Sequence, residues 1–406
     1  MVMPIRLLYL TAETCPTFRV DVDVLFGKYL PRFGVYSDIV AGRALGQTRE
    51  VVWGGGDVFL CSMTGSKAKK HIKILLHGIY QLFRANNTRY QAIQVRDLPL
   101  LAVFGLLAAK HKRLPFYYWM SYPIPEGQIA LASERGLSSG WLKYLLTWLR
   151  GQIGCLLLYY VILPRADHIF VQSDRMKFNM IKRGILPEKM TSVPMGIDLD
   201  VAQPEKIPPS EDPRLSGRRA LVYLGTLDRP RRIEVLFEML AQIRKKVPEI
   251  LLVLVGDTED NQHREWLRCR AASAGVADDV LWTGWLPTKE GWRYVRAAEI
   301  GLSPIPRGFL LDISSPTKVP EYLALGVPVV CNDNPDQADV IDKSRAGRCV
   351  LYTAKNFADA VCELLALDLK TLSSLITSGK RYVAEKRDYQ ILAKALSLQY
   401  ESILFK

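Results

Sequence analysis

Strand-like and helix-like segments alternate in two successive runs, and this alternation most constrains the fold of the 406-residue chain. Short apolar runs such as Ile5 to Leu10 and Ala220 to Leu224 are separated by longer segments with helical periodicity. The pattern predicts an α/β protein with two doubly wound parallel sheets that face a central cleft. A proline-rich polar stretch from Gln203 to Gly217 is typical of a linker between them.

Composition and missing motifs exclude several classes. With 49% hydrophobic and 23% charged residues, the chain is neither disordered nor fibrous. Its seven cysteines are scattered and include no Cys-x-x-Cys pair, so we expect neither a disulfide framework nor a zinc site, and a reducing cytoplasm fits best. A Walker loop, a Gly-x-Ser-x-Gly elbow and a strand-linked Gly-x-Gly-x-x-Gly are all absent, which disfavours kinases, hydrolases and dehydrogenases.

Positive charge is concentrated in the first half of the sequence. Residues 1–190 hold 25 Lys and Arg against 12 Asp and Glu, whereas residues 191–406 hold 29 of each. The whole net charge of +13 therefore lies in the first half. Such asymmetry favours a polyanionic partner, either a nucleic acid or an anionic membrane surface.

The stretch from Ser314 to Val330 predicts a helix start, a short helix and a buried strand. Ser315 before Pro316 is typical of an N-cap with proline at the first helical position. A helix N-terminus attracts anions, Lys318 would add a full charge, and Glu321 on the same face could bind hydroxyls. Diphosphate and ribose are the ligands that this pattern favours, and an ordinary capped crossover helix is the alternative.

A second candidate segment follows the first strand of the second half. Gly225 would let the backbone approach a ligand, and the three arginines after it suit a phosphate. Arg231 and Lys318 could together neutralise a diphosphate, so we expect neither a metal nor another cofactor. The nearest metal-like pattern, Asp21 with Asp23, lies in a predicted helix on which the two side chains diverge.

Candidate residues of the first half follow two predicted strands. Arg96 and Asp97 come after one strand, and Ser121 and Tyr122 come after the next. In an open α/β sheet, residues just past the carboxyl end of a strand face the crevice. We therefore expect these four residues on the acceptor side of a cleft.

Residues 141–163 form the most apolar part of the chain. Charged and polar residues interrupt the segment, and its uninterrupted apolar run of about ten residues is shorter than the roughly twenty needed to span a bilayer. Aromatic residues interleaved with cations favour an interfacial segment, in which Trp141, Lys143, Trp148 and Arg150 would contact the membrane. The alternative is a core helix, which is favoured for residues 154–163.

Three motifs resemble those of retaining glycosyltransferases of family 4, which have the GT-B fold. They are Val222 to Gly225 (VYLG) followed by basic residues, Lys318 to Val330 (KVPEYLALGVPVV), and Ala166 to Ser173 (ADHIFVQS) with Val193 to Asp198 (VPMGID). The resemblance implies two Rossmann-like domains. It implies an acceptor-side domain at 1–200 completed by a closing helix at 388–406, and a nucleotide-sugar domain at 201–387.

The resemblance also implies roles for individual residues. Glu321 matches the second glutamate of the family's Glu-x7-Glu motif, and Ser314 stands where the first would be, as in members with a Ser-Pro-Thr-Lys variant. Arg231 stands where the family has a donor-phosphate lysine, and Ser121 or Tyr122 replaces a first-domain histidine. The expected donor-binding residues are Gly225, Thr226, Arg231, Gly256, Gly284, Ser314, Ser315, Pro316, Thr317, Lys318 and Glu321.

The expected function is transfer of a sugar from a nucleoside-diphosphate sugar to a saccharide acceptor with retention. Arg231, Lys318 and Asp97 are the expected catalytic residues, and no protein nucleophile is needed. A lipid-linked acceptor in cell-surface polysaccharide synthesis, at the cytoplasmic face of an anionic membrane, would fit the basic first half. The alternatives are a catalytically degenerate nucleotide-sugar binder and a sugar-nucleotide epimerase, whereas a nucleic-acid partner is disfavoured because no groove-reading motif is present.

Overall fold

The computed structural model describes residues 4–44, 46, 51–136 and 140–405, and these divide into two compact units. The first unit comprises residues 1–194 and 389–406, and the second comprises residues 195–388. The chain therefore passes between the units after Pro194 and after Asp388. The predicted linker from Gln203 to Gly217 is wrong in its placement, because it lies inside the second unit, where Ile207 is buried in the core.

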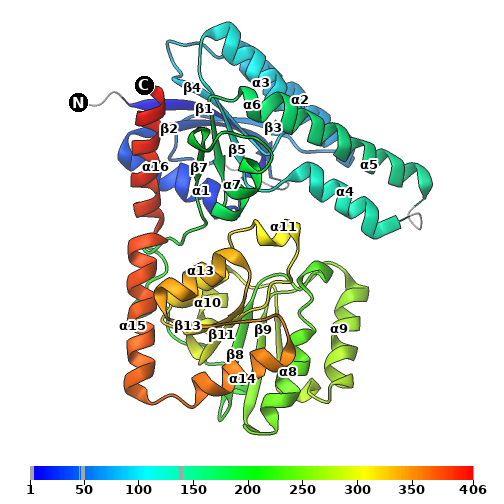
Figure 1. The fold of residues 1–406 in the computed structure, drawn as a ribbon, viewed down its shortest axis with the longest axis vertical. Helices are drawn as coiled ribbons and strands as arrows, with labels where there is room; N and C mark the ends of the chain where they lie inside the picture. The colour runs from blue at the N-terminus through cyan, green and yellow to red at the C-terminus, as the bar shows by residue number, and fades with distance from the viewer. Residues whose placement is uncertain (1–3, 45, 47–50, 137–139, 406) are drawn as a thin grey trace. The chain divides into compact units, whose positions relative to one another are not determined.

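The first unit contains a seven-stranded parallel sheet in the order β3-β2-β1-β4-β5-β6-β7. Helices cover it on both faces (Figure 1). Its strands are β1 (Ile5–Cys15), β2 (Val35–Arg43), β3 (Val58–Ser62), β4 (Ala92–Arg96), β5 (Phe116–Met120), β6 (His168–Val171) and β7 (Met190–Ser192). Its helices are α1 (Val20–Asp23), α2 (Lys67–Arg84), α3 (Pro99–Lys112), α4 (Ile124–Arg135), α5 (Trp141–Leu156), α6 (Leu163–Arg165), α7 (Asp174–Ile181) and α16 (Tyr389–Leu404).

The second unit contains a six-stranded parallel sheet in the order β10-β9-β8-β11-β12-β13. Its strands are β8 (Arg219–Leu224), β9 (Ile250–Val255), β10 (Val280–Gly284), β11 (Ile300–Ser303), β12 (Val329–Asn332) and β13 (Gly347–Val350). Its helices are α8 (Val235–Arg244), α9 (Asn261–Ser273), α10 (Thr288–Ala297), α11 (Phe309–Asp312), α12 (Lys318–Ala324), α13 (Pro335–Ser344), α14 (Ala354–Leu365) and α15 (Leu369–Lys386). The prediction of two doubly wound parallel sheets is thus confirmed.

Local expectations near the N-terminus need correction. The first strand continues to Cys15 instead of ending at Leu10, and the helix expected around Asp21 and Asp23 is a short α1 followed by a π-helical and a 3-10 turn.

Buried apolar side chains fill both faces of each sheet, as expected where strands are covered by helices on both sides. In the first unit the core includes side chains from α16, although this helix ends the sequence. The hydroxyl of Tyr400 donates a hydrogen bond to Gln94 Oε1 in β4 at 2.5 Å. The closing helix therefore packs on the first sheet.

Candidate functional site

The loop before α12 is built differently from the sequence prediction. The helix begins at Lys318, and the residue before it, Thr317, makes no side-chain cap. The prediction of an N-cap at Ser315 is wrong, because its hydroxyl accepts the N–H of Met195 at 2.9 Å and donates to Asp336 Oδ2 at 2.9 Å. Pro320 is tolerated because it lies in the first turn, where backbone N–H groups have no partner within the helix.

A buried ion pair fixes this loop. The guanidinium of Arg387 contacts Asp336 Oδ1 at 2.8 Å, Ser315 Oγ at 3.2 Å and the carbonyl of Met195 at 3.2 Å. Arg387 is only 4% exposed. Because the charge is paired and hydrogen-bonded inside the protein, removing one partner would leave an unpaired charge and be costly.

Lys318 reaches from α12 to the carboxyl end of β8. A Cβ atom on Gly225 would lie 2.9 Å from Lys318 Cε and 3.1 Å from its Nζ, so a larger residue here would push the end of this side chain from its position. Gly225 also has φ +143°, which side chains rarely adopt. The sequence placed these two residues in one site, and the structure brings them into contact.

Burial and nearby charge change the protonation of Lys318. Desolvation, followed by repulsion from Arg231, lowers the pKa of Lys318 to about 7, while Glu321 acts in the opposite direction. Near neutral pH this ammonium group is therefore only partly protonated. An anion bound beside it would favour the charged form.

Glu321 is held by Trp292, which no sequence motif indicated. Trp292 in α10 donates its indole N–H to Glu321 Oε2 at 2.9 Å. Burial raises the pKa of Glu321, and the hydrogen bonds from Trp292 and Thr317 oppose that rise. No local sequence pattern could have indicated this pairing, because 29 residues separate the two side chains.

Three glycines follow three neighbouring strands of the second sheet. Gly225, Gly256 and Gly284 come at the ends of β8, β9 and β10, and each has a positive φ. A Cβ on Gly256 would lie 2.1 Å from the carbonyl oxygen of Gly225, and Gly256 forms a backbone bridge with Gly284. The edge is therefore lined by bare backbone, which a ligand can approach closely.

Arg231 completes a pair of cations at this edge. It ends a 3-10 turn after β8 and is half-buried. Within the residues that the structure describes it makes no ion pair, whereas Arg229 next to it pairs with Asp260 at 3.1 Å. Its positive charge adds to the effect of desolvation in lowering the pKa of Lys318. Two neighbouring cations with little carboxylate compensation can hold a diphosphate.

Other predicted donor-side residues are engaged in local contacts. Ser314 Oγ donates to the carbonyl of Leu311 at 2.7 Å, and the carbonyl of Thr226 accepts the hydroxyl of Tyr223 at 2.9 Å. Pro316 and Thr317 lie in the turn that leads to α12. With seven residues, α12 is too short for a strong macrodipole, so the cationic character comes from side chains.

The candidates of the first unit form a paired network. Arg96, 1% exposed, binds Asp21 Oδ2 at 2.6 Å. Asp97 accepts hydrogen bonds from the N–H of Ser121 at 2.9 Å, from its hydroxyl, and from the N–H of Tyr122 at 3.4 Å. Burial raises the pKa of Asp97, and Arg96 opposes that rise. Arg96 and Asp97 therefore shape the strand ends.

Two further residues join this network. Arg19 donates to Ser121 Oγ at 3.3 Å and lies 3.6 Å from Glu13, whose pKa is raised by burial. The sequence pattern did not indicate Glu13, because the apolar run ends at Leu10, before the strand extension that carries this carboxylate. Both side chains keep partial exposure, so they are available to a ligand.

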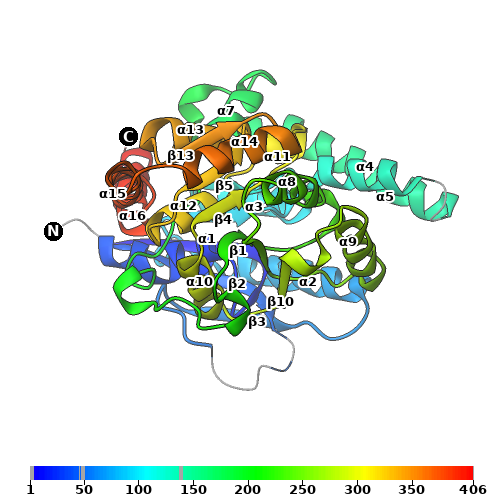
Figure 2. The same cartoon turned by 90° about the horizontal axis from the view of Figure 1, so that it is seen from below.

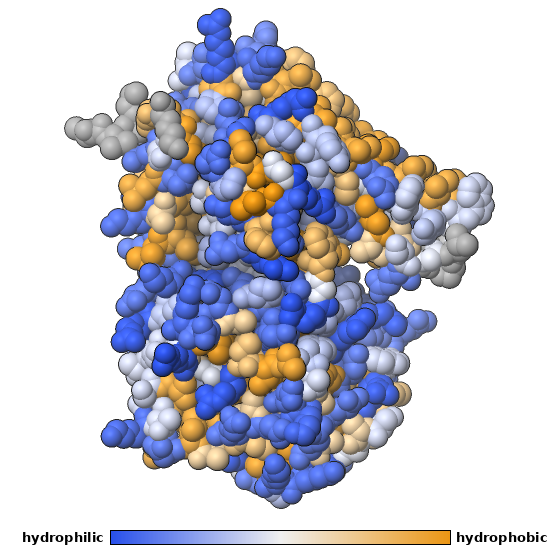
Figure 3. All heavy atoms as spheres, in the orientation of Figure 1, coloured by the Kyte–Doolittle hydropathy of each residue, from blue (hydrophilic) through white to orange (hydrophobic). Residues whose placement is uncertain are grey.

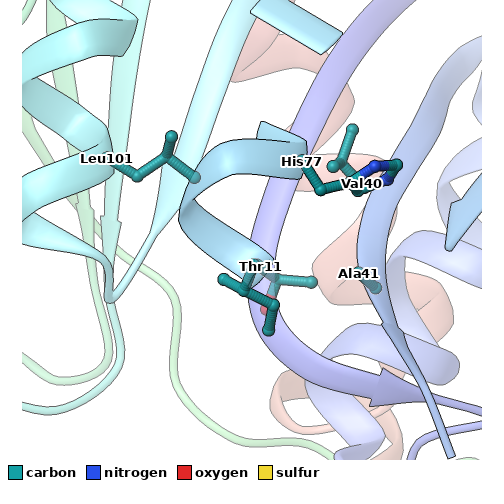
Figure 4. A pocket seen from close by; sticks show the side chains of 6 residues that line it. Thr11, Val40, Ala41, His77 and Leu101 are labelled. Atoms are coloured by element: carbon teal, nitrogen blue, oxygen red, sulfur yellow. The ribbon is translucent and has the colours of Figure 1, made fainter. Parts of the chain in front are cut away.

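Among the described residues, neither a cluster of metal ligands nor a cavity contributes to the candidate site. Within the described residues, no three His, Cys, Asp or Glu side chains are grouped so that they could hold a metal ion. A small hollow beneath α2 is lined by Thr11, Val40, Ala41, Ile74, His77 and Leu101 (Figure 4). His77 Nε2 lies 3.1 Å from the carbonyl oxygen of Phe59, so this hollow belongs to the packing of α2 on the sheet.

The segment predicted to contact a membrane is a single long helix. It runs from Trp141 to Arg165 through α5, a π-helical turn and α6, and by length and composition it could cross a membrane. The expectation that the segment is too short was therefore wrong as to length. Trp141 is exposed and Trp148 half-buried, whereas Leu158 and Ile162 are buried.

Both halves of the chain match glycosyltransferase family models. Residues 24–201 match the model described as Glycosyltransferase Family 4, and residues 218–367 match the model described as Glycosyl transferases group 1.

Curated relatives point to the same class. A protein of Mycobacterium tuberculosis named GDP-mannose-dependent alpha-(1-6)-phosphatidylinositol monomannoside mannosyltransferase is 29% identical over 211 residues, which cover 50% of this chain and 54% of that protein. The putative teichuronic acid biosynthesis glycosyltransferase TuaH of Bacillus subtilis is 27% identical over 180 residues, or 43% of this chain and 42% of that protein. The chain thus matches about half the length of these relatives.

Solved structures share the fold along nearly the whole chain. HepE of Anabaena, solved in complex with UDP, has a TM-score of 0.69 at 14% identity, covering 98% of this chain and 100% of that one. Sucrose-phosphate synthase of Thermosynechococcus elongatus has a TM-score of 0.71 at 17% identity, covering 98% and 99%. The chain has the two-domain GT-B fold.

Proposed function

We propose that this protein transfers a sugar from a nucleoside-diphosphate sugar to a saccharide acceptor, with retention of anomeric configuration. The observation that carries the proposal is the contact of Lys318 with Gly225 beside Arg231, at a strand edge lined by three glycines. A diphosphate matches this edge because it is anionic and can lie against bare backbone. Glu321, already oriented by Trp292, would accept hydrogen bonds from ribose hydroxyls.

The chemical step follows from these charges. As the bond between the anomeric carbon and the diphosphate oxygen breaks, negative charge grows on the leaving diphosphate. Lys318 and Arg231 stabilise that charge, and the acceptor hydroxyl attacks from the same face and loses its proton to a leaving-group oxygen. No covalent enzyme intermediate is involved. A chelator such as EDTA should leave the rate unchanged if the two cations suffice.

The acceptor is proposed to be lipid-linked, in the synthesis of a cell-surface polysaccharide at the cytoplasmic face of the membrane. Two observations support this: the excess positive charge of residues 1–190, and relatives whose names refer to a phosphatidylinositol mannoside and to teichuronic acid. In the first unit, the half-exposed Glu13 and the exposed Arg19 and Tyr122 are the groups that would meet acceptor hydroxyls, whereas Ser121 is buried.

The decisive experiment is substitution of Lys318. Purified protein is first screened against UDP- and GDP-sugars by thermal shift, and turnover is then measured with the sugar that binds. Lys318→Ala should lower kcat by about two orders of magnitude, the scale of a lost electrostatic stabiliser. Lys355→Ala, at an exposed site in α14, is the matched control and should behave as wild type. Unchanged turnover in Lys318→Ala would contradict the mechanism.

A degenerate nucleotide-sugar binder is the second candidate, because Ser314 stands where an acidic residue is expected and its hydroxyl is engaged with Leu311. Such a protein would bind donor and show neither transfer nor donor hydrolysis above background. Turnover that depends on Lys318 would exclude it.

A further inference from the structure

Three helices of the first unit carry basic residues and no acidic ones. Together α2, α3 and the helix from Trp141 to Arg165 contain ten Lys and Arg residues and not one Asp or Glu. The helices are also neighbours. Gly78 of α2 faces Leu101 of α3, and α3 packs against the π-helical turn that continues α5.

The same helices expose apolar side chains at helical spacing. On the longest one, the stripe consists of Leu142, Leu146, Leu149, Ile153, Leu156 and Tyr160, and Tyr160 is 72% exposed. The members recur every three or four residues, so they share one side of the helix. A solvent-facing stripe more than four turns long is unusual for a helix that only packs on its own domain.

Shorter stripes continue the surface on the two neighbouring helices. Leu76, Tyr80 and Phe83 are exposed on α2, and Phe104 and Leu107 are exposed on α3. Figure 3 shows hydrophobic side chains gathered over the part of the first unit where Figure 1 draws α3 and α5. We call this combined surface of α2, α3 and α5 the acid-free face.

The opposite side of the long helix is fixed to its own unit. A Cβ on Gly151 would lie 2.6 Å from Ile129 of α4, and Leu158 and Ile162 are buried. Figures 1 and 2 both show α4 and α5 side by side, extending away from the sheet. A membrane-spanning helix would need lipid-compatible surroundings on all sides, whereas this one offers lipid a single face.

We propose that the acid-free face binds the surface of an anionic lipid bilayer, with α5 lying in the plane of the interface. The apolar stripes enter the boundary between headgroups and acyl chains, and the cations contact anionic headgroups. Positive charge without acidic residues is complementary to such a surface and opposes pairing of the face with a second copy of itself. The inference deepens the proposed function, because it rests on an acceptor held in a membrane.

Vesicle flotation without donor or acceptor tests the inference separately from catalysis. The full chain should float with vesicles of phosphatidylcholine containing about a third phosphatidylglycerol, and weakly with phosphatidylcholine alone. Because the headgroup contacts are electrostatic, 0.5 M salt should release part of the protein. Alkaline carbonate should release it completely, whereas a spanning helix would remain.

Two variants separate the apolar and charged contributions. Leu146→Ser with Ile153→Ser, and separately Lys143→Ser with Arg150→Ser, should each lower the partition coefficient about tenfold or more. The matched controls are Leu351→Ser with Leu369→Ser, and Lys245→Ser with Lys246→Ser, all in the second unit. Circular dichroism spectra and thermal unfolding should match those of wild type in every variant, which shows that each one folds.

Several results would overturn the proposal. They are flotation of the α5 variants equal to wild type, no flotation of wild type, retention after carbonate, or a wild-type dimer in solution that the α5 variants dissociate. The last result would assign the face to a second copy of the chain. Loss of vesicle binding with intact transfer to a soluble acceptor would leave the enzymatic proposal standing.

Discussion

Both units bring charged residues to the carboxyl-end edge of their parallel sheet, but the charges are paired with opposite ones in the first unit, whereas two cations lie near each other in the second. In the first unit, Arg96 is buried in an ion pair with Asp21, and the carboxylate of Asp97 accepts hydrogen bonds from Ser121 and Tyr122. In the second unit, Lys318 and Arg231 stand close enough to repel each other. An ion pair of opposite charges holds the local backbone in place. Two cations held close together instead favour the binding of an anion.

The largest effect is expected from removing one partner of the buried ion pair in the first unit. Arg96→Ala leaves the carboxylate of Asp21 buried without its partner and should lower the free energy of unfolding by about 3–5 kcal/mol. Urea denaturation followed by circular dichroism measures this. The double variant Arg96→Met, Asp21→Leu should recover most of the loss, and equal instability of the single and double variants would contradict the account.

A smaller effect is expected from adding a methyl group beside the two cations of the second unit. Gly225→Ala places a methyl group 2.9 Å from Lys318 Cε and should displace its ammonium, so the affinity for UDP or GDP should fall about tenfold, or roughly 1.4 kcal/mol. Gly308→Ala is the control, because nothing lies within 4 Å of the added atom. Calorimetric titration gives both values, and equal affinities would show that the contact does not matter.

The pKa of Lys318 predicts a dependence on pH. Since the pKa is about 7 in the free protein and a bound diphosphate favours the protonated form, nucleoside-diphosphate affinity should decline as pH rises from 6 to 8.5, by at most about tenfold per pH unit. Lys318→Met should bind weakly with a flatter profile. A wild-type profile as flat as that of the variant would argue against a depressed pKa.

The smallest effect is expected for the contribution of Lys318 to the free energy of unfolding, in contrast to that of Arg96. The folded pKa of Lys318 is below the model-compound value of 10.5, so between pH 7 and about 10.5 the unfolded chain holds a proton that the folded protein lacks. Burying this lysine therefore imposes a cost on folding that shrinks as pH rises across this window. At pH 7, Lys318→Met should unfold at the same or slightly higher urea concentration than wild type. A loss comparable with that of Arg96→Ala would refute the distinction between the two units.

The sequence predicted the parts of this molecule that depend on periodicity. Alternation of apolar runs located the two sheets, and glycines at strand ends located the edge of the second sheet that forms the candidate site. It could not predict the partner of Ser315, since Met195 lies 120 residues away and no local pattern distinguishes a cap from a tertiary contact. It also missed Trp292 and Glu13, because tertiary packing orients the first and an extended strand exposes the second.

The ion pair of Arg387 with Asp336 has a mechanical consequence. Met195 and Arg387 lie at the two points where the chain leaves the second unit, and Ser315 is bonded to both. The backbone of Ile197 is bridged to Asp388 as well. Both exits of the chain are therefore tied by hydrogen bonds to the same side chain, three residues before Lys318. A single buried ion pair thus connects the two exits to the loop that leads into α12.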